Sequence, residues 1–223
     1  MSGVARSGGG LFRRAFDGDG FWNALWSPNS AYPALKTERL LIRPPQKSDH
    51  VAWARLRRAS AASLKPWEPS WSSDHLSAAA FRRRVRWSQR EIDAGRAYPL
   101  LIFERDPRAG PRLVGGLTLE HVRHGAAMSA SLGYWLGVGA EGRGLMAETI
   151  EAVAAFAFDD LDLSRLEAAC LPENTRSRRL LERAGFHEEG FASAYLRIDG
   201  AWRDHVLYER RRQDRIDPAA REA

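Results

Sequence analysis

The sequence predicts a single domain of the α/β (α+β) class, with a mixed, mostly antiparallel sheet flanked by helices. Strand and helix patterns follow one another in the order β-α-α-β-β-β-α-β-α-β-β, with no internal repeat. The chain has 223 residues, of which 44% are hydrophobic and 28% charged, as in ordinary globular proteins. A chain of this length buries roughly 70% of its unfolded surface, so it can build a core without a disulfide or a metal.

The strands are predicted from short apolar and β-branched runs that end at turn residues. Pro44 and Pro45 end the first run, and the segment 106–111, which holds two prolines and a glycine, separates the second run from the third. The predicted strands are 40–43, 98–104, 112–121, 128–138, 166–171, 195–198 and 201–208.

The last two strands form a hairpin around the two-residue turn signal Asp199-Gly200. Counting outward from this turn places Arg197 opposite Trp202. Two residues further out, the count places Tyr195 opposite Asp204, so all four side chains are expected on one face of the hairpin.

The helices are predicted from apolar residues that recur every three or four positions. The clearest helix begins at Gly144, and its apolar positions are Ala147, Ile150, Ala154, Ala157 and Leu161. Gly185 follows the last helix as the usual left-handed cap residue. The first predicted helix begins near 48–49 and runs through 57. The other predicted helices cover 76–94, 144–161 and 175–184.

The two ends of the chain differ in composition from the middle. A glycine triplet at 8–10 is followed by aromatic residues that show no helical or strand period. We therefore expect an N-terminal extension at 1–34, one domain at 35–211 and a charged C-terminal tail at 212–223.

Cysteine content and charge narrow the class of protein. Cys170 is the only cysteine, which excludes an internal disulfide framework, and no Cys/His cluster has zinc spacing. No apolar run approaches the ~20 residues of a membrane span, so a cytoplasmic protein without a metal or a membrane partner is expected. The 34 Lys and Arg exceed the 28 Asp and Glu, a net charge of +6. This charge favours a nucleic acid, a ribosome or a polyanionic cofactor, or reflects a general bias toward arginine.

The segment Leu136–Ala147 runs from a predicted strand through a glycine-rich turn into the start of a helix. Glycines let the backbone approach a ligand closely, and the free N–H groups at a helix start bind anions. Arg143 adds a positive charge at the same place. The motif predicts a pyrophosphate cradle, and the alternative is an ordinary tight turn. Its spacing is neither that of a P-loop nor that of the dinucleotide fingerprint.

A second motif spans Pro172–Phe186 and opens the last helix. Asn174 is the expected N-cap, and Ser177 shares one helix face with Leu181 and Ala184. The alternative is that both polar residues have only a structural role. Asn174 would then cap the helix, and the Ser177 hydroxyl would hydrogen-bond to the helix backbone.

In this order along the chain, the two motifs resemble those of the GNAT superfamily of acetyl-CoA-dependent N-acetyltransferases. The family's pyrophosphate pattern, Gln/Arg-x-x-Gly-x-Gly/Ala, falls on Glu141, Gly144 and Met146, so the first and last positions depart from it. The Gly-x-Gly-x-Met form is similar to the ribosomal-protein-alanine (RimJ/RimL) type. Further segments that resemble this type are 36–43, 64–69, 132–136 and 195–205.

The resemblance implies a sheet with a splay between strands 130–138 and 165–171, where the thioester of the co-substrate acetyl-CoA would lie. It also implies which residues bind acetyl-CoA, through backbone groups along the pantetheine arm, N–H groups at the pyrophosphate and one side chain near the thioester. In that order they are Trp135, Leu136 and Val138; Gly142, Arg143, Gly144, Leu145, Met146 and Ala147; and Asn174.

The implied reaction is direct attack of a neutral amine on the thioester, which gives an amide and free CoA. The amine must lose a proton and the leaving thiolate must gain one. Many relatives carry the acid as a tyrosine seven residues after the asparagine, but that position is Leu181 here, so Ser177 on the same face is the expected replacement. Glu68, in the loop 65–69, is the expected base. The alternatives for the base are Glu120, His121, Asp204 and a chain of water molecules.

The residues expected to bind the acceptor are Trp67, Tyr195, Trp202 and Asp204, because their segments flank the acceptor end of the cleft in the family. The expected acceptor is the α-amino group of a protein that starts with Ala or Ser, such as a ribosomal protein. Two alternatives stay open: a small-molecule acetyltransferase that acts on an antibiotic or an amino-acid-like amine, and a ribosome-assembly factor with a basic RNA-binding surface. A weak association with ribosomes or RNA, and a monomer or a homodimer, are compatible with each.

Overall fold

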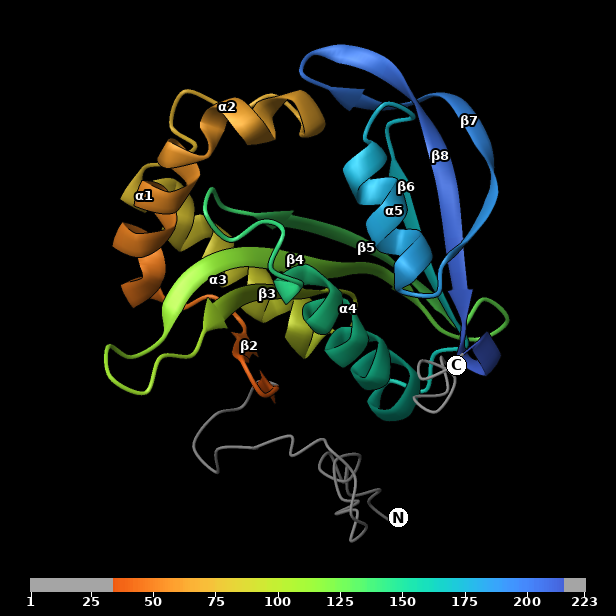
Figure 1. The fold of residues 1–223 in the computed structure, drawn as a ribbon, viewed down its shortest axis with the longest axis horizontal. Helices are drawn as coiled ribbons and strands as arrows, with labels where there is room; N and C mark the ends of the chain where they lie inside the picture. Colours follow the sequence, from red (N-terminus) through yellow and green to blue (C-terminus); the bar gives the residue numbers. More distant parts are fainter. Residues whose placement is uncertain (1–33, 215–223) are drawn as a thin grey trace, which may run out of the picture.

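The computed structural model describes residues 34–214, which form one eight-stranded sheet with helices on both faces (Figure 1). The strands lie in the order β1-β2-β3-β4-β5-β6-β8-β7, and neighbours are antiparallel except for β5 and β6. The predicted mixed, mostly antiparallel sheet is therefore confirmed. The strand bounds are β1 Leu35–Lys36, β2 Leu40–Arg43, β3 Tyr98–Glu104, β4 Arg112–Arg123, β5 Ser129–Leu136, β6 Arg165–Cys170, β7 His187–Ile198 and β8 Ala201–Arg211.

The predicted helices are confirmed, with ends that differ by a few residues. The short α2 was not predicted, because a single turn is too short to show a period. The α-helices of the described residues are α1 His50–Ala59, α2 Ala61–Leu64, α3 Ala78–Asp93, α4 Leu145–Ala155 and α5 Thr175–Arg183. A π-helical turn, Phe156–Asp160, extends α4, and short 3-10 turns lie at Lys47–Asp49, Lys65–Trp67 and Arg212–Asp214.

The two faces of the sheet carry separate hydrophobic cores, because successive side chains of a strand point to opposite faces. In β3, Leu100 and Ile102 belong to the larger core, which includes buried residues of α4 and α5. Leu101 and Phe103 belong to the smaller core, with buried residues of α1 and α3. Figure 1 accordingly shows α4 in front of the strands and α3 behind them.

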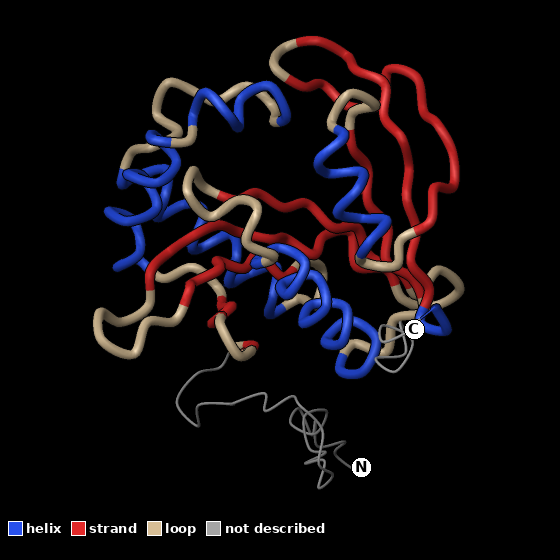
Figure 2. The backbone as a smooth tube through the Cα atoms, in the orientation of Figure 1, coloured by secondary structure: helices blue, strands red, loops and turns tan. Residues whose placement is uncertain are grey.

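The central strands β5 and β6 pair over only part of their length, four of the eight residues of β5 and four of the six residues of β6. The parallel register runs from Ser129 with Arg165 to Leu132 with Ala168. Beyond this point β5 stays paired with β4 alone, and β6 with β8 alone, so the sheet opens (Figure 2). The splay implied by the resemblance is present, and within residues 34–214 no strand pairs with the edge of β5 that faces it.

Helix α1 packs directly against the end of β5. A Cβ atom on Gly137 would lie 2.3 Å from Cδ1 of Leu56, far inside van der Waals contact. The glycine is therefore required by this close approach, which brings α1 to the mouth of the splay. The main-chain N–H of Gly137 donates to the carbonyl of Val114 at 2.9 Å and holds the strand end in place.

The hairpin of β7 and β8 is confirmed near its turn, where Arg197 pairs with Trp202. The predicted pairing of Tyr195 with Asp204 is wrong. The register shifts between residues 192 and 196, where three residues of β7 face one residue of β8. Counting outward from a turn assumes an uninterrupted ladder, and a β-bulge of this kind breaks that assumption.

The start of β7 was predicted at 195 but lies at His187. Most residues of this strand are exposed, so they show no alternation of apolar and polar residues for a sequence reading to find. No helix among residues 34–214 is long and apolar enough to cross a membrane. Residues 1–33 and 215–223 lie outside the described residues, so the predicted extension at 1–34 and tail at 212–223 stay predictions.

Candidate active site

The glycine-rich turn between β5 and α4 presents a row of unpaired N–H groups. Gly144 takes a φ of 74° and is the N-cap of α4, with no side-chain cap. The N–H groups of Leu145, Met146 and Ala147 have no hydrogen-bond acceptor among the described residues, whereas the side chains of Leu145 and Met146 are buried. Free donors at a helix N-terminus attract anions, so this turn fits a pyrophosphate. A Cβ on Gly142 would meet nothing within 4 Å, which leaves the approach open.

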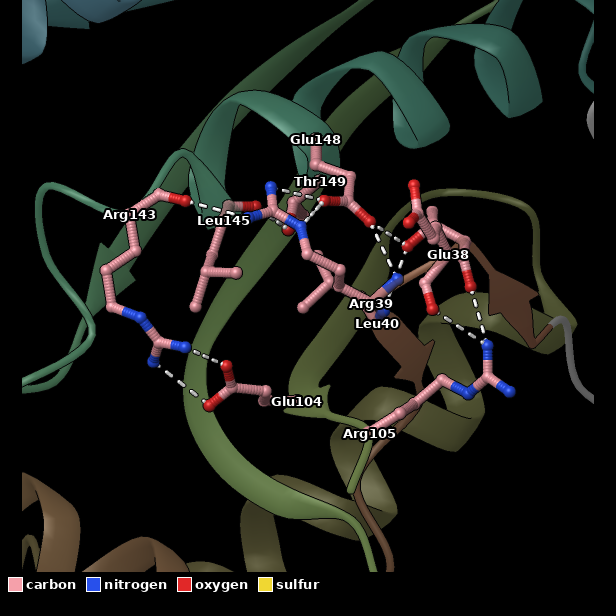
Figure 3. Close-up of polar contacts among 10 residues, drawn as sticks. Glu38, Arg39, Leu40, Glu104, Arg105, Arg143, Leu145, Glu148 and Thr149 are labelled. Carbon is pink, nitrogen blue, oxygen red and sulfur yellow. Dashed lines mark hydrogen bonds and ion pairs between the residues drawn. The ribbon is translucent and has the colours of Figure 1, made fainter. Parts of the chain in front are cut away.

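Arg39 holds this turn from the side of β2. Its Nη1 donates to the main-chain carbonyl of Arg143 at 2.9 Å, and its Nε donates to Oε2 of Glu148 at 2.6 Å (Figure 3). The hydroxyl of Thr37 donates to the other oxygen of Glu148. The segment between β1 and β2 is thus tied to the first turn of α4. The sequence reading missed Arg39 and Glu148, because no motif links positions so far apart.

The side chain of Arg143 points to Glu104 rather than into the turn (Figure 3). Arg112 donates to the same carboxylate at 2.6 Å. Hydrogen bonds from Arg143, and then from Arg112, lower the pKa of Glu104 to about 2. The Arg143 guanidinium is therefore held beside an ionised carboxylate at neutral pH.

The residues predicted to line the pantetheine arm lie along the open edge of β5 and just beyond it. Trp135 and Leu136 pair with Gly116 and Gly115 of β4 on one side, and their other side faces the splay. The N–H of Val138 donates to the Ser60 hydroxyl at 2.9 Å. A main-chain hydrogen bond of Val138 with a ligand would therefore use its carbonyl oxygen.

Ser177 and Asn174 lie in the first turn of α5, across the splay from β5. The Asn174 side chain accepts the N–H of Ser177 at 3.1 Å, which confirms the predicted cap and leaves the amide NH2 group without a partner among the described residues. The Ser177 hydroxyl lies 2.7 Å from the hydroxyl of Tyr134. Burial raises the pKa of Tyr134, and it raises the pKa of the neighbouring Cys170 thiol to about 11.

Glu68 lies in a dense contact network after α2. Both of its carboxylate oxygens accept from the buried Arg57, and Oε2 also accepts from Nε1 of Trp71 at 2.8 Å. The Arg57 guanidinium lies over two tryptophan rings, 4.4 Å from the centroid of Trp71 and 4.7 Å from that of Trp135. The sequence reading did not single out Arg57 or Trp71.

The loop after α2 meets the tip of the hairpin. The N–H of Asp199 donates to the main-chain carbonyl of Glu68 at 3.0 Å, so the two segments predicted to flank the acceptor are joined. Figure 1 shows this approach between the segment after α2 and the β7–β8 turn. The alternative bases Glu120 and His121 lie elsewhere, since Glu120 pairs with Ser131 before the sheet opens.

The predicted acceptor-binding residues are partly or largely exposed in this region. The exposed fractions are 39% for Trp67, 46% for Tyr195 and 66% for Trp202. The Tyr195 ring lies edge-on to His205, with centroids 5.6 Å apart. Asp204 accepts the N–H of Ala194 at 2.8 Å, within the bulge. These aromatic side chains leave apolar surface available to a ligand.

The fold and the site together define a class of protein. A helix start that fits an anion lies at one end of an open sheet, a splay with a half-buried pair of hydroxyl groups lies beside it, and an aromatic surface lies beyond. This is the arrangement of a transferase that takes an acyl group from a donor bearing a diphosphate.

Known proteins agree with this class. Residues 39–187 match the family model described as acetyltransferase (GNAT) domain. The ribosomal protein uS5-alanine N-acetyltransferase of Escherichia coli (strain K12) is 33% identical over 173 residues, 78% of this chain and 88% of that protein. The structure of Mycobacterium smegmatis RimJ in complex with CoA-disulfide has a TM-score of 0.74 and 34% identity, and the match covers 82% of this chain and 86% of that chain.

A third match is ribosomal-protein-S5-alanine acetyltransferase from Vibrio fischeri, at a TM-score of 0.74 and 25% identity over 81% of this chain and 97% of that chain. The chain belongs to the GNAT acetyltransferase family, and it is an acetyl-CoA-dependent N-acetyltransferase. The resemblance of its sequence to the RimJ/RimL type is thereby confirmed.

Proposed function

We propose that the chain acetylates the N-terminal α-amino group of a protein, with Ala or Ser as the first residue and a ribosomal protein as the acceptor. The observation that carries this proposal is the composition of the acceptor end. Trp67, Tyr195 and Trp202 are exposed there, and two of its acids, Glu68 and Asp204, already accept hydrogen bonds within the chain. A peptide N-terminus brings one positive charge and main-chain groups, which suit such a surface. An aminoglycoside brings several positive charges and requires a more acidic groove. The similarity to the uS5-alanine N-acetyltransferase supports the same acceptor.

The N–H groups from Gly142 to Ala147 would hold the pyrophosphate of acetyl-CoA, and the edge of β5 at Trp135 and Leu136 that faces the splay would bind the pantetheine arm. Acetyl-CoA supplies the thioester carbonyl that the amine attacks. The unpaired NH2 group of Asn174 would contact the acyl end. Ser177 would donate a hydrogen bond to the departing sulfur. The position where many relatives carry a tyrosine acid holds the buried Leu181, whose side chain has no hydrogen-bond donor.

Glu68 is the proposed base. A carboxylate has about four lone-pair positions, and Arg57 and Trp71 use three of them, which leaves one for the ammonium group of the acceptor. The two hydrogen bonds from Arg57 hold this carboxylate in its orientation. Water that takes the proton directly is the alternative.

A weak association with ribosomal RNA belongs to the same proposal. Helix α3 carries a row of exposed arginines at Arg82, Arg86 and Arg90, which have no ion-pair partner among the described residues. Trp87, 37% exposed, lies among them. Guanidinium groups bind phosphates and an exposed indole stacks on bases. An enzyme that associates with ribosomes would act in the cytoplasm, beside its acceptor.

Replacing the three arginines by glutamate should abolish a salt-sensitive binding to ribosomal RNA. Unchanged binding would contradict the proposed association.

The acceptor is tested by competition. Equal concentrations of an Ala-starting peptide, an N-blocked peptide that contains lysine and an aminoglycoside are mixed with the enzyme and acetyl-CoA, and products are quantified by mass spectrometry. The proposal expects the Ala-starting peptide to be acetylated fastest. Faster acetylation of the aminoglycoside would favour the small-molecule reading and overturn this proposal.

A further inference from the structure

The hydroxyl of Ser177 has a partner on the opposite side of the splay. Tyr134 comes from β5, two residues beyond the last pair that β5 forms with β6, and Ser177 comes from α5. Their hydroxyl oxygens lie 2.7 Å apart, and this is the one hydrogen bond of the Tyr134 hydroxyl among the described residues. The pair therefore bridges the place where the sheet opens.

The surroundings determine which oxygen donates. Burial raises the pKa of Tyr134, so the phenol keeps its proton at neutral pH. If Ser177 donated to it, the phenol proton would need another acceptor, and the described residues offer none. Leaving the donor of this half-buried phenol unsatisfied is costly. Tyr134 therefore donates to Oγ of Ser177, and the Ser177 proton points to another group. The Cys170 thiol, with which Ser177 also interacts, lies beside it.

We propose that Tyr134 is a positioning residue: its O–H donates to Oγ of Ser177 and thereby turns the Ser177 O–H toward the sulfur of CoA. This inference rests on the proposed role of Ser177. A serine hydroxyl can rotate, and a fixed donor on its oxygen removes that freedom. A donor that is itself hydrogen-bonded is also polarised and becomes a stronger donor. The Tyr134–Ser177 pair thus supplies the hydrogen-bond donor that the buried side chain of Leu181 lacks.

The proton balance requires no change at either hydroxyl. As the amine nitrogen forms its bond to the acyl carbon, the C–S bond breaks and its electron pair goes to the sulfur. The Ser177 O–H donates a hydrogen bond to that sulfur while the charge develops. The nitrogen loses one proton to Glu68 or water, and the sulfur gains one from solvent, so both hydroxyls end the cycle as they began it.

Tyr134→Phe tests the proposal, with Tyr98→Phe as the matched control. Tyr98 is also buried in the same sheet, in β3, where its ring lies against Phe156, and it makes no contact with Ser177. Calorimetry measures the affinity for CoA and for desulfo-CoA, which lacks the sulfur, and steady-state kinetics measures kcat and KM. For Tyr134→Phe we expect kcat to fall about 10-fold with KM for acetyl-CoA within about 3-fold, since one indirect donor is lost. The preference for CoA over desulfo-CoA should shrink as well, and Tyr98→Phe should change neither quantity.

The outcomes separate this inference from the proposed role of Ser177. If Ser177→Ala lowers kcat and the preference for CoA while Tyr134→Phe leaves both unchanged, the inference about Tyr134 is wrong and Ser177 keeps its role. If Ser177→Ala changes neither, the role of Ser177 fails and the inference falls with it. Equal losses of affinity for CoA and desulfo-CoA in Tyr134→Phe would show that Tyr134 only shapes the site, which also overturns the proposal.

Discussion

Arg57 donates from two nitrogens to the two carboxylate oxygens of Glu68, with Nη1 2.7 Å from Oε1, and the Arg57 side chain is only 6% exposed. The pair joins α1 to the segment after α2. The main-chain carbonyl of Glu68 also accepts the N–H of Asp199 from the hairpin turn. Glu68 therefore connects the structures that frame the acceptor end, in addition to any part it has in proton transfer.

The first prediction concerns this pair. Glu68→Gln should lower the free energy of unfolding by about 1–3 kcal/mol, because the buried Arg57 loses its charged partner. As the proposed base, Glu68 should also contribute about 100-fold to kcat, with the KM for acetyl-CoA little changed. Thermal unfolding and steady-state kinetics measure both effects.

Glu91→Gln is the control for this variant, since Glu91 pairs with Arg96 at the end of α3, away from the splay. It should leave kcat unchanged. A Glu68→Gln enzyme that is less stable but keeps the kcat of the unchanged enzyme would contradict the base role and assign the proton to water.

The second prediction uses two glycines with similar backbone geometry. Gly144 and Gly125 have φ of 74° and 68°, so an alanine is strained by about 1–2 kcal/mol at either position. Gly125 lies in the turn between β4 and β5, with open space around it. Both Gly→Ala variants should lose a similar amount of stability. Only Gly144→Ala should lower the affinity for CoA, by about 10-fold, and calorimetry that finds equal affinities would remove the anion-binding role of the turn.

Much of this site could be predicted because its signals are local. The glycine turn before α4, the Asn174 cap and the turn at Asp199-Gly200 each lie within a few residues of sequence. The contacts of Tyr134 and Arg57 could not be predicted from the sequence, because the fold brings their partners to them. Ser177, for example, lies 43 positions from Tyr134 along the chain. Register is also a property of two strands, and the bulge in β7 has no signal in either strand alone.

The third prediction concerns Glu104, whose ionised carboxylate holds the guanidinium of Arg143. Because hydrogen bonds from Arg143 and Arg112 lower the pKa of Glu104 to about 2, acid down to pH 4 does not release Arg143. Glu104→Gln removes a negative charge near the anion-binding turn and frees a positive one. CoA should bind about 2- to 10-fold tighter, and the gain should shrink at high salt. Weaker binding of CoA in calorimetry would show that the pair is needed to shape the turn.

The fourth prediction concerns the pH dependence of stability. Burial, followed by the charges of Arg57 and Arg84, lowers the pKa of His75 from 6.5 to about 4. The unfolded chain therefore takes up a proton below pH 6.5 that the folded chain takes up only near pH 4, so the free energy of unfolding falls as the pH falls through this window. His75→Gln should remove about 1–2 kcal/mol of the difference between pH 7 and pH 5. Denaturant titrations at both values measure it, and an unchanged difference would show that His75 titrates normally.

The proposed acceptor of the acetyl group is an α-amine. One peptide that carries both a free N-terminal Ala and an internal Lys tests it most directly, since the two amines then share one concentration and one binding event. The peptide is incubated with the enzyme and labelled acetyl-CoA, and fragmentation by tandem mass spectrometry locates the label. We expect the label on the α-nitrogen of Ala and its loss in Ser177→Ala. A label on the ε-nitrogen of Lys, with the α-amine left free, would contradict it.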